Sequence, residues 1–207
     1  MALAIPRNGS VAFAVLLLWL TVAWNIVEGM VAISAGLRAG SIALVGFGLD
    51  SAIEVTAALV LLWRLRLADG DERAESRERR AHQIVGATFF VLACYIVAQA
   101  TFTVVTGREP ESSGAGLALA ALSLVVMPGI GLLKRWNAVR LGSRALVAES
   151  TETIVCSYLS LTLFIGLGAN ALWGWWWADI AAALAMVPWI VKEGLEGLRG
   201  ESCEDNC

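Results

Sequence analysis

The sequence predicts an all-α membrane protein with six transmembrane helices and both termini in the cytoplasm. The first observation is that the apolar residues, 58% of the 207, are gathered into long runs. A helix needs about 20 mostly apolar residues to cross the hydrocarbon core of a bilayer. Six runs approach or exceed that length: residues 11–35, 41–63, 83–106, 114–133, 145–170 and 174–191. They leave almost no chain for a soluble domain.

The second observation is the distribution of the basic residues, which predicts the sidedness of the connections. Of the 15 lysines and arginines, only Arg38 and Arg108 fall in connections that follow the first, third or fifth run. Basic residues are retained on the cytoplasmic side, so we expect the remaining connections and both termini there. The protein is expected to be a multi-pass protein of the cell membrane, which in a bacterium is the cytoplasmic membrane.

The first two runs contain polar residues but are still interpreted as spans. Residues 11–35 are longer than the apolar core of a signal peptide, lack a clean small-residue cleavage site and include Asn25 and Glu28. Residues 41–63 are apolar enough for a bilayer, yet they carry Asp50 and Glu54 near the middle.

The connections between the runs have distinct compositions. Residues 64–82 have charges of mixed sign and no apolar face, which is typical of a solvated connector, and residues 134–145 predict a short basic loop at the headgroups. Residues 106–116 indicate a short external turn. The tryptophan-rich residues 172–179 indicate a tight external hairpin in the interfacial aromatic belt. Asp179 is expected to cap or precede the sixth helix, whose N-terminal dipole favours an acid.

The domain organisation follows from these elements. We expect one membrane domain, residues 1–200, and a short cytoplasmic tail, residues 201–207. The tail carries Cys203 and Cys207 among acids, but a C-x-x-x-C pair without further ligands is a weak indication of metal binding. The formal net charge of −3 gives no indication of a nucleic-acid partner, and the expected partner is the lipid bilayer.

Two pairs of donor side chains indicate the functional site. Asp50 and Glu54 are four residues apart in the second run, and Glu152 and Cys156 have the same spacing in the fifth. Residues i and i+4 lie on one face of a helix, so each helix presents two donors in one direction. At a rise of about 1.5 Å per residue, the two pairs overlap in depth to within a few ångströms. Ionisable groups are costly inside a bilayer and therefore indicate function.

These four donors on two facing helices predict a metal site. Zinc accepts carboxylate oxygen and thiolate sulfur in tetrahedral coordination, and a bound cation would offset the charges that are costly to bury. Two alternatives remain open at this point. The acids could be protonated and hydrogen-bonded to a neighbouring span, or they could form a proton path without metal.

Three further polar residues are candidate accessory groups. Glu149 lies one turn nearer the cytoplasm than Glu152, where it either attracts cations or is an interfacial acid. Asn25 and Glu28 belong to a polar stripe that begins at Thr21 in the first run. Glu28, near mid-membrane, is a candidate accessory ligand or proton carrier, whereas interhelical hydrogen bonding is the favoured interpretation for Asn25.

The segments around the four donors resemble the cation diffusion facilitator (cation efflux) family. "AGSIALVGFGLDSAIEV" (Ala39–Val55) resembles its second span, and "AESTETIVCSYLSLTLFIGL" with "GWWWAD" resembles its fifth span and the turn into the sixth. Members are secondary transporters that export divalent metals, most often zinc, in exchange for protons. The resemblance, which covers most of the chain, implies the same activity here, with Asp50, Glu54, Glu152 and Cys156 as the metal ligands.

The sequence departs from the family pattern in two places. The usual fifth-span pair is His or Asp followed by Asp, whereas this chain has Glu152 and Cys156. A thiolate favours zinc or cadmium, while three carboxylates also accept cobalt or manganese, so zinc is favoured without excluding the others. The family's cytoplasmic C-terminal domain, which dimerises and senses metal, is not expected, because the sequence ends at Cys207. A homodimer would therefore form through the transmembrane helices.

The expected mechanism is metal–proton antiport, because metal ligands must be deprotonated and protons therefore compete with metal. The alternative is a non-transporting membrane metal sensor or scaffold subunit with the same fold. An enzyme is not expected, because the sequence contains no H-E-x-x-H or similar constellation. No prosthetic group is expected either, since the divalent ion is the substrate. A passive channel is disfavoured, because a tight four-ligand site binds too strongly for fast conduction.

Overall fold

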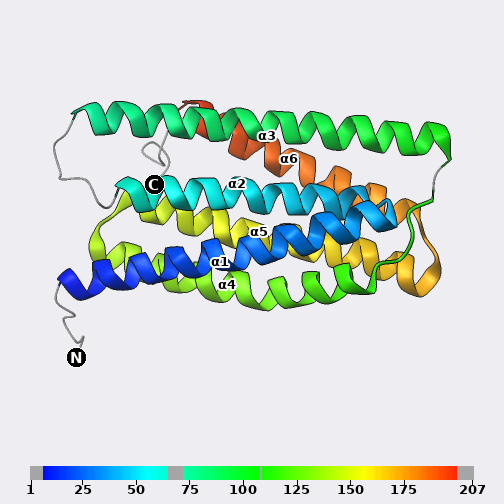
Figure 1. Ribbon diagram of the computed structural model, residues 1–207, viewed down its shortest axis with the longest axis horizontal. Helices are drawn as coiled ribbons and strands as arrows, with labels where there is room; N and C mark the ends of the chain where they lie inside the picture. Colours follow the sequence, from blue (N-terminus) through cyan, green and yellow to red (C-terminus); the bar gives the residue numbers. More distant parts are fainter. Residues whose placement is uncertain (1–6, 65–71, 108, 200–207) are drawn as a thin grey trace.

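The computed structural model describes residues 7–64, 72–107 and 109–199, all of whose long elements are helices. The six helices are α1 (Arg7–Ala39), α2 (Ile42–Arg64), α3 (Glu72–Thr106), α4 (Gly114–Leu141), α5 (Arg144–Trp173) and α6 (Trp177–Arg199). They lie side by side along the longest axis of the molecule, and consecutive helices run in opposite directions (Figure 1). The predicted all-α class is therefore confirmed. The tail at 201–207, with its two cysteines, lies outside the described residues.

The start of α1 and the end of α6 lie at the same end of the bundle (Figure 1). We call it the basic end, because the last turns of α4 bring Arg135 and Arg140 there. Which side of a membrane this end faces remains a prediction from the distribution of basic residues.

Five of the six helices are long and apolar enough to cross a membrane: the segments are Ser10–Ala39, Ile42–Trp63, Gly86–Thr106, Gly114–Leu141 and Glu149–Trp173. The helix α6 is not among these five, because Asp179 near its start and Lys192 and Glu193 near its end leave only a short uncharged stretch. The expectation of six helices is thus confirmed, and that of membrane spans is supported for five of them.

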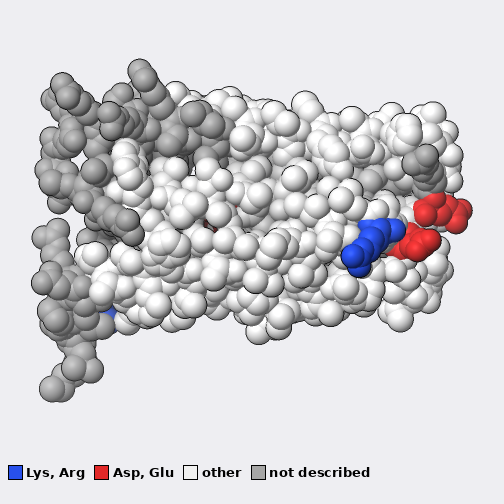
Figure 2. Space-filling model, viewed as in Figure 1, with Lys and Arg blue, Asp and Glu red and all other residues white. Residues whose placement is uncertain are grey.

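The outer surface of the bundle fits a lipid environment. Large apolar side chains such as Val91, Val125 and Leu132 are more than half exposed, which is unusual for a surface that faces water. The face in Figure 2 is almost uncharged along the described length, and its charged side chains gather near the end of α1 and the α3–α4 connection. The surface therefore supports a multi-pass membrane protein.

Two helices extend into segments that the sequence predicted to be connections. The helix α3 begins at Glu72, so residues 72–82 are helical rather than a connector, and α4 continues to Leu141 through the segment expected as a basic loop. Both segments are rich in Ala, Arg and Glu or Leu, which favour helix, and extending an existing helix is easier than starting one. The α4–α5 connection shrinks to Gly142, with a left-handed φ of 63°, and Ser143, which caps α5.

The helices pack most extensively in three pairs, α1 with α2, α3 with α6, and α4 with α5, and α2 also contacts α3, α5 and α6. This central place of α2 explains why 61% of its span is buried, against 28% for α3. The polar residues Asp50 and Glu54 are therefore carried by the most enclosed helix of the bundle.

Asp179 connects α6 to α2 at the end opposite the basic end. Its buried carboxylate accepts hydrogen bonds from the backbone N–H of Ile42 (2.9 Å) and Ala43 (3.5 Å) and from the Ser41 hydroxyl. The structure places Asp179 in the first turn of α6, where its charge suits the helix dipole as expected, but its carboxylate does not cap that helix. It caps α2, because the first N–H groups of α2 have no partner within that helix and lie beside the start of α6.

Close contact between α3 and α6 depends on Gly86. A Cβ atom at this position would lie 2.7 Å from the backbone nitrogen of Leu198 and 2.8 Å from the carbonyl carbon of Gly197. Backbone atoms cannot rotate away as a flexible side chain can, so any larger residue would push the two helices apart.

We predict that Gly86→Ala lowers the free energy of unfolding by about 1–3 kcal/mol through this overpacking. The matched control is Gly129→Ala in α4, where an added Cβ would meet nothing within 4 Å. Helix propensity alone should leave that variant unchanged or up to about 1 kcal/mol more stable. Thermal unfolding in detergent measures both. Equal stability of the two variants would contradict the close α3–α6 contact.

Candidate metal site

A small cavity lies between α2, α3, α5 and α6, and all four predicted ligands line it: Asp50, Glu54, Glu152 and Cys156. Its volume of about 20 Å³ gives room for one water molecule or a small ion. The i, i+4 spacing turns each pair of donors to the same face of its helix, and the antiparallel packing of α2 with α5 brings the two faces together.

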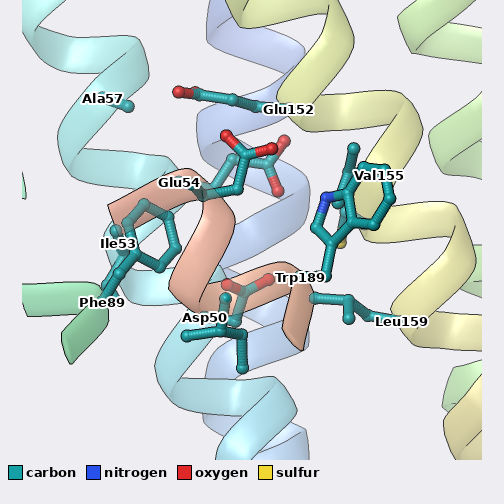
Figure 3. A pocket seen from close by; sticks show the side chains of 12 residues that line it. Asp50, Ile53, Glu54, Ala57, Phe89, Glu152, Val155, Leu159 and Trp189 are labelled. Carbon is teal, nitrogen blue, oxygen red and sulfur yellow. The ribbon is translucent and has the colours of Figure 1, made fainter. Parts of the chain in front are cut away.

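The donors are arranged along the cavity rather than around one point. Figure 3 shows Glu152 at one end, Asp50 at the other and Glu54 between them. Among the described residues, no three His, Cys, Asp or Glu side chains lie close enough together to hold an ion. Binding of one ion by all four would therefore require the long glutamate side chains to turn toward each other.

Glu54 has a buried oxygen atom that lacks a hydrogen bond. Its Oε1 accepts a hydrogen bond from the Thr153 hydroxyl at 3.0 Å. Its Oε2 has no partner within the described part of the chain, although the residue is only 6% exposed. An unpaired buried carboxylate oxygen is costly, so this atom fits a cation or a proton.

A buried ion pair lies beside the cavity. Lys134 Nζ is 2.6 Å from Glu149 Oε1 and donates a hydrogen bond to the Thr153 hydroxyl at 2.9 Å. The Thr153 hydroxyl also donates a hydrogen bond to Glu54. It therefore links the ammonium group of Lys134 on α4 to the Glu54 carboxylate of the cavity. The expectation that Lys134 lies at the headgroups is wrong. Lys134 is buried, because its pairing with Glu149 compensates for the cost of burial.

The accessory candidates lie outside the cavity. Glu149 is held in the ion pair, and none of the three candidates is among the cavity-lining residues. Glu28 is fully buried and accepts hydrogen bonds from Ser51 at 3.0 Å, from Trp24 at 3.3 Å and from Ser123. It therefore joins α1 to α2 and α4.

Asn25 does not make the interhelical hydrogen bond expected of it. Its amide donates to the carbonyl of Thr21 in the same helix at 3.1 Å, and its Oδ1 is buried without a partner among the described residues. The neighbouring acid Glu28 makes the bonds between helices instead.

Sequence reasoning missed three side chains of α6 that line the cavity, Trp189, Ile190 and Glu193. Glu193 lies beyond the last apolar run, which ends at residue 191. The signal that could have found it is its i+4 spacing from Trp189, which places both on one helical face.

The helical bundle, its lipid-compatible surface and a buried cavity lined by acids and a thiol define a multi-pass membrane protein with a candidate cation site. Residues 18–200 match the family described as the cation efflux transmembrane domain. The chain therefore belongs to the cation efflux family, as its resemblance predicted. This family consists of transporters rather than enzymes, and membership supports cation transport in general terms.

Two curated relatives show distant similarity. The chain is 24% identical over 147 residues to "Transmembrane protein 163" of Xenopus laevis, covering 71% of this chain and 52% of the relative. It is 27% identical over 177 residues to an "Uncharacterized transporter" of Synechocystis sp., covering 79% of this chain and 57% of the relative. The chain thus spans about half the length of the curated relatives it matches.

We predict that Lys134→Met destabilises the protein by about 3–5 kcal/mol, because it leaves the Glu149 carboxylate buried without its partner. The double variant Lys134→Met/Glu149→Gln should recover part of this loss, since no buried charge remains unpaired. Lys192→Met is the matched control, because Lys192 pairs with Glu196 at 3.6 Å on the surface and surface pairs contribute little. Thermal unfolding of these three variants and of Glu149→Gln alone would measure the effect. A double variant as unstable as the sum of both single changes would contradict the ion pair.

Proposed function

We propose that this protein exports a divalent metal cation, zinc in preference to cadmium, cobalt or manganese, in exchange for protons. The transported ion would bind Asp50, Glu54, Glu152 and Cys156. The observation that carries the proposal is the single cavity that all four donors line. The unpartnered Oε2 of Glu54 and membership of the cation efflux family support it.

Exchange for protons follows from the chemistry of these donors. Carboxylates and thiolates bind metal only when deprotonated, so metal and protons compete for the same atoms. A site that releases its metal to one side takes up protons in its place. Opening the cavity alternately to the two sides of the membrane then couples the two movements in opposite directions.

The preference for zinc rests on the mixed donor set. The sulfur of Cys156 favours zinc and cadmium, whereas the three carboxylates also accept cobalt and manganese. Export is the proposed direction, because the chain belongs to the cation efflux family. A homodimer through the transmembrane helices stays a prediction, and all four donors come from one chain.

We predict that Asp50→Asn reduces zinc flux by more than about 100-fold, since loss of a ligand should exceed the 10- to 100-fold cost of losing an outer-shell partner. The measurement is zinc uptake by reconstituted vesicles under a pH gradient. The control is Glu111→Gln in the α3–α4 connection, which does not line the cavity. If the folded wild-type protein carries none of the four metals, the transporter assignment fails and a sensor or scaffold subunit takes its place.

We predict that Cys156→Ser shifts the metal preference from zinc and cadmium toward cobalt and manganese, because a hydroxyl replaces the soft thiolate. The ratio of cadmium to manganese uptake should fall by about tenfold or more. Cys94→Ser is the matched control, since Cys94 is exposed on α3 and Cys156 is buried. An unchanged ratio in the Cys156 variant would show that the thiol is a packing residue rather than a ligand.

A further inference from the structure

The helix α6 forms one wall of the cavity. It contributes an acid, Glu193, that is not one of the four proposed ligands. Trp189, Ile190 and Glu193 line the cavity together, one helical turn from first to last. Trp189 lies one turn before Glu193 on the same face of α6, and its indole Nε1 is buried.

The direction of the helices shows where Glu193 lies along the cavity. Asp50 and Leu159 lie toward one end in Figure 3, and Ala57 and Glu152 lie toward the other. The second of these ends is nearer the basic end, because α2 runs toward the basic end and α5 runs away from it. The helix α6 also runs toward the basic end, and Glu193 lies about 9 Å of helix rise before its end. Of the three α6 residues that line the cavity, Glu193 is therefore the one nearest the basic end.

The charges around Glu193 leave it available for a cation. The acids that line the cavity with it are Asp50 and Glu54 on α2 and Glu152 on α5. Its own neighbour Lys192 is paired with Glu196 at 3.6 Å and lies over the Trp189 ring at 4.5 Å. A cavity with acids on several walls concentrates cations. The unpartnered Oε2 of Glu54 lies in the same cavity, and the Glu54 residue is 94% buried.

We propose that Glu193 is a capture residue, which takes a divalent cation approaching from the basic end and passes it to the four donors. This inference rests on the proposed transport function. It makes α6 a contributor to metal recognition, whereas the expected site uses the second and fifth spans alone. A capture residue acts on metal that arrives from its own side of the membrane, so its removal affects the two directions of transport unequally.

The test compares Glu193→Gln with Glu193→Asp and with the control Glu196→Gln. Glu196 is one turn further along α6, pairs with Lys192 and does not line the cavity. Each variant is reconstituted in vesicles of known orientation, and zinc uptake is measured with zinc at the basic end and then at the other end. We expect Glu193→Gln to raise KM about tenfold with zinc at the basic end, with kcat little changed. Glu193→Asp should restore most of the affinity, and Glu196→Gln should match the wild type.

Two results would overturn the inference while leaving the transport function intact. One is that the wild-type protein transports zinc and Glu193→Gln has the same KM as Glu196→Gln. The other is an equal loss from both sides, which would show a structural role. If the wild-type protein transports no zinc, titration calorimetry of zinc binding in detergent still tests capture. Binding weakened about tenfold by Glu193→Gln alone would support it, and equal binding by all variants would reject it.

Discussion

The rest of this structure depends on one constraint: a charged group inside a bilayer must find its partners within the protein, because no water is present to solvate it. Three of the buried groups meet this constraint across helices. Lys134 pairs with Glu149, Asp179 caps the start of α2, and Glu28 accepts hydrogen bonds from hydroxyl groups of α2 and α4. Buried carboxylate oxygens without a hydrogen-bond partner among the described residues remain on Glu54 at the cavity and on Glu149 beside it.

The same polar contacts hold the helices that surround the cavity. The Lys134–Glu149 pair joins α4 to α5, Asp179 joins α6 to α2, and Glu28 joins α1 to both α2 and α4. Between helices in lipid there is no hydrophobic driving force, so such bonds and close packing at small residues provide the association. The cavity is therefore enclosed by helices whose relative positions are set by contacts outside it.

This division of roles matters for a site that must bind and release an ion. Lys134 donates a hydrogen bond to the Thr153 hydroxyl, and Thr153 donates one to Glu54. The carboxylate of Glu54 is therefore held in place by residues outside the cavity. Glu152 lines the cavity and has a long side chain that can turn toward a cation. A binding site with one fixed and one adaptable acid suits temporary rather than permanent binding, because tight enclosure of an ion would oppose its release.

The sequence by itself determined the helices, most of the spans, the family and the two donor pairs. Backbone groups in lipid must form their hydrogen bonds within long apolar helices, so the spans are visible as apolar runs. An i, i+4 spacing defines one face of a helix without reference to any neighbouring helix. Other features depend on which helices become neighbours. Lys134 was expected at the headgroups and is buried, since its partner lies on α5. Asp179 caps α2 instead of its own helix, and Glu193 reaches a cavity formed mainly by other helices. Only the tertiary structure decided these three, because hydrogen bonds and ion pairs between helices depend on distances that local sequence does not contain.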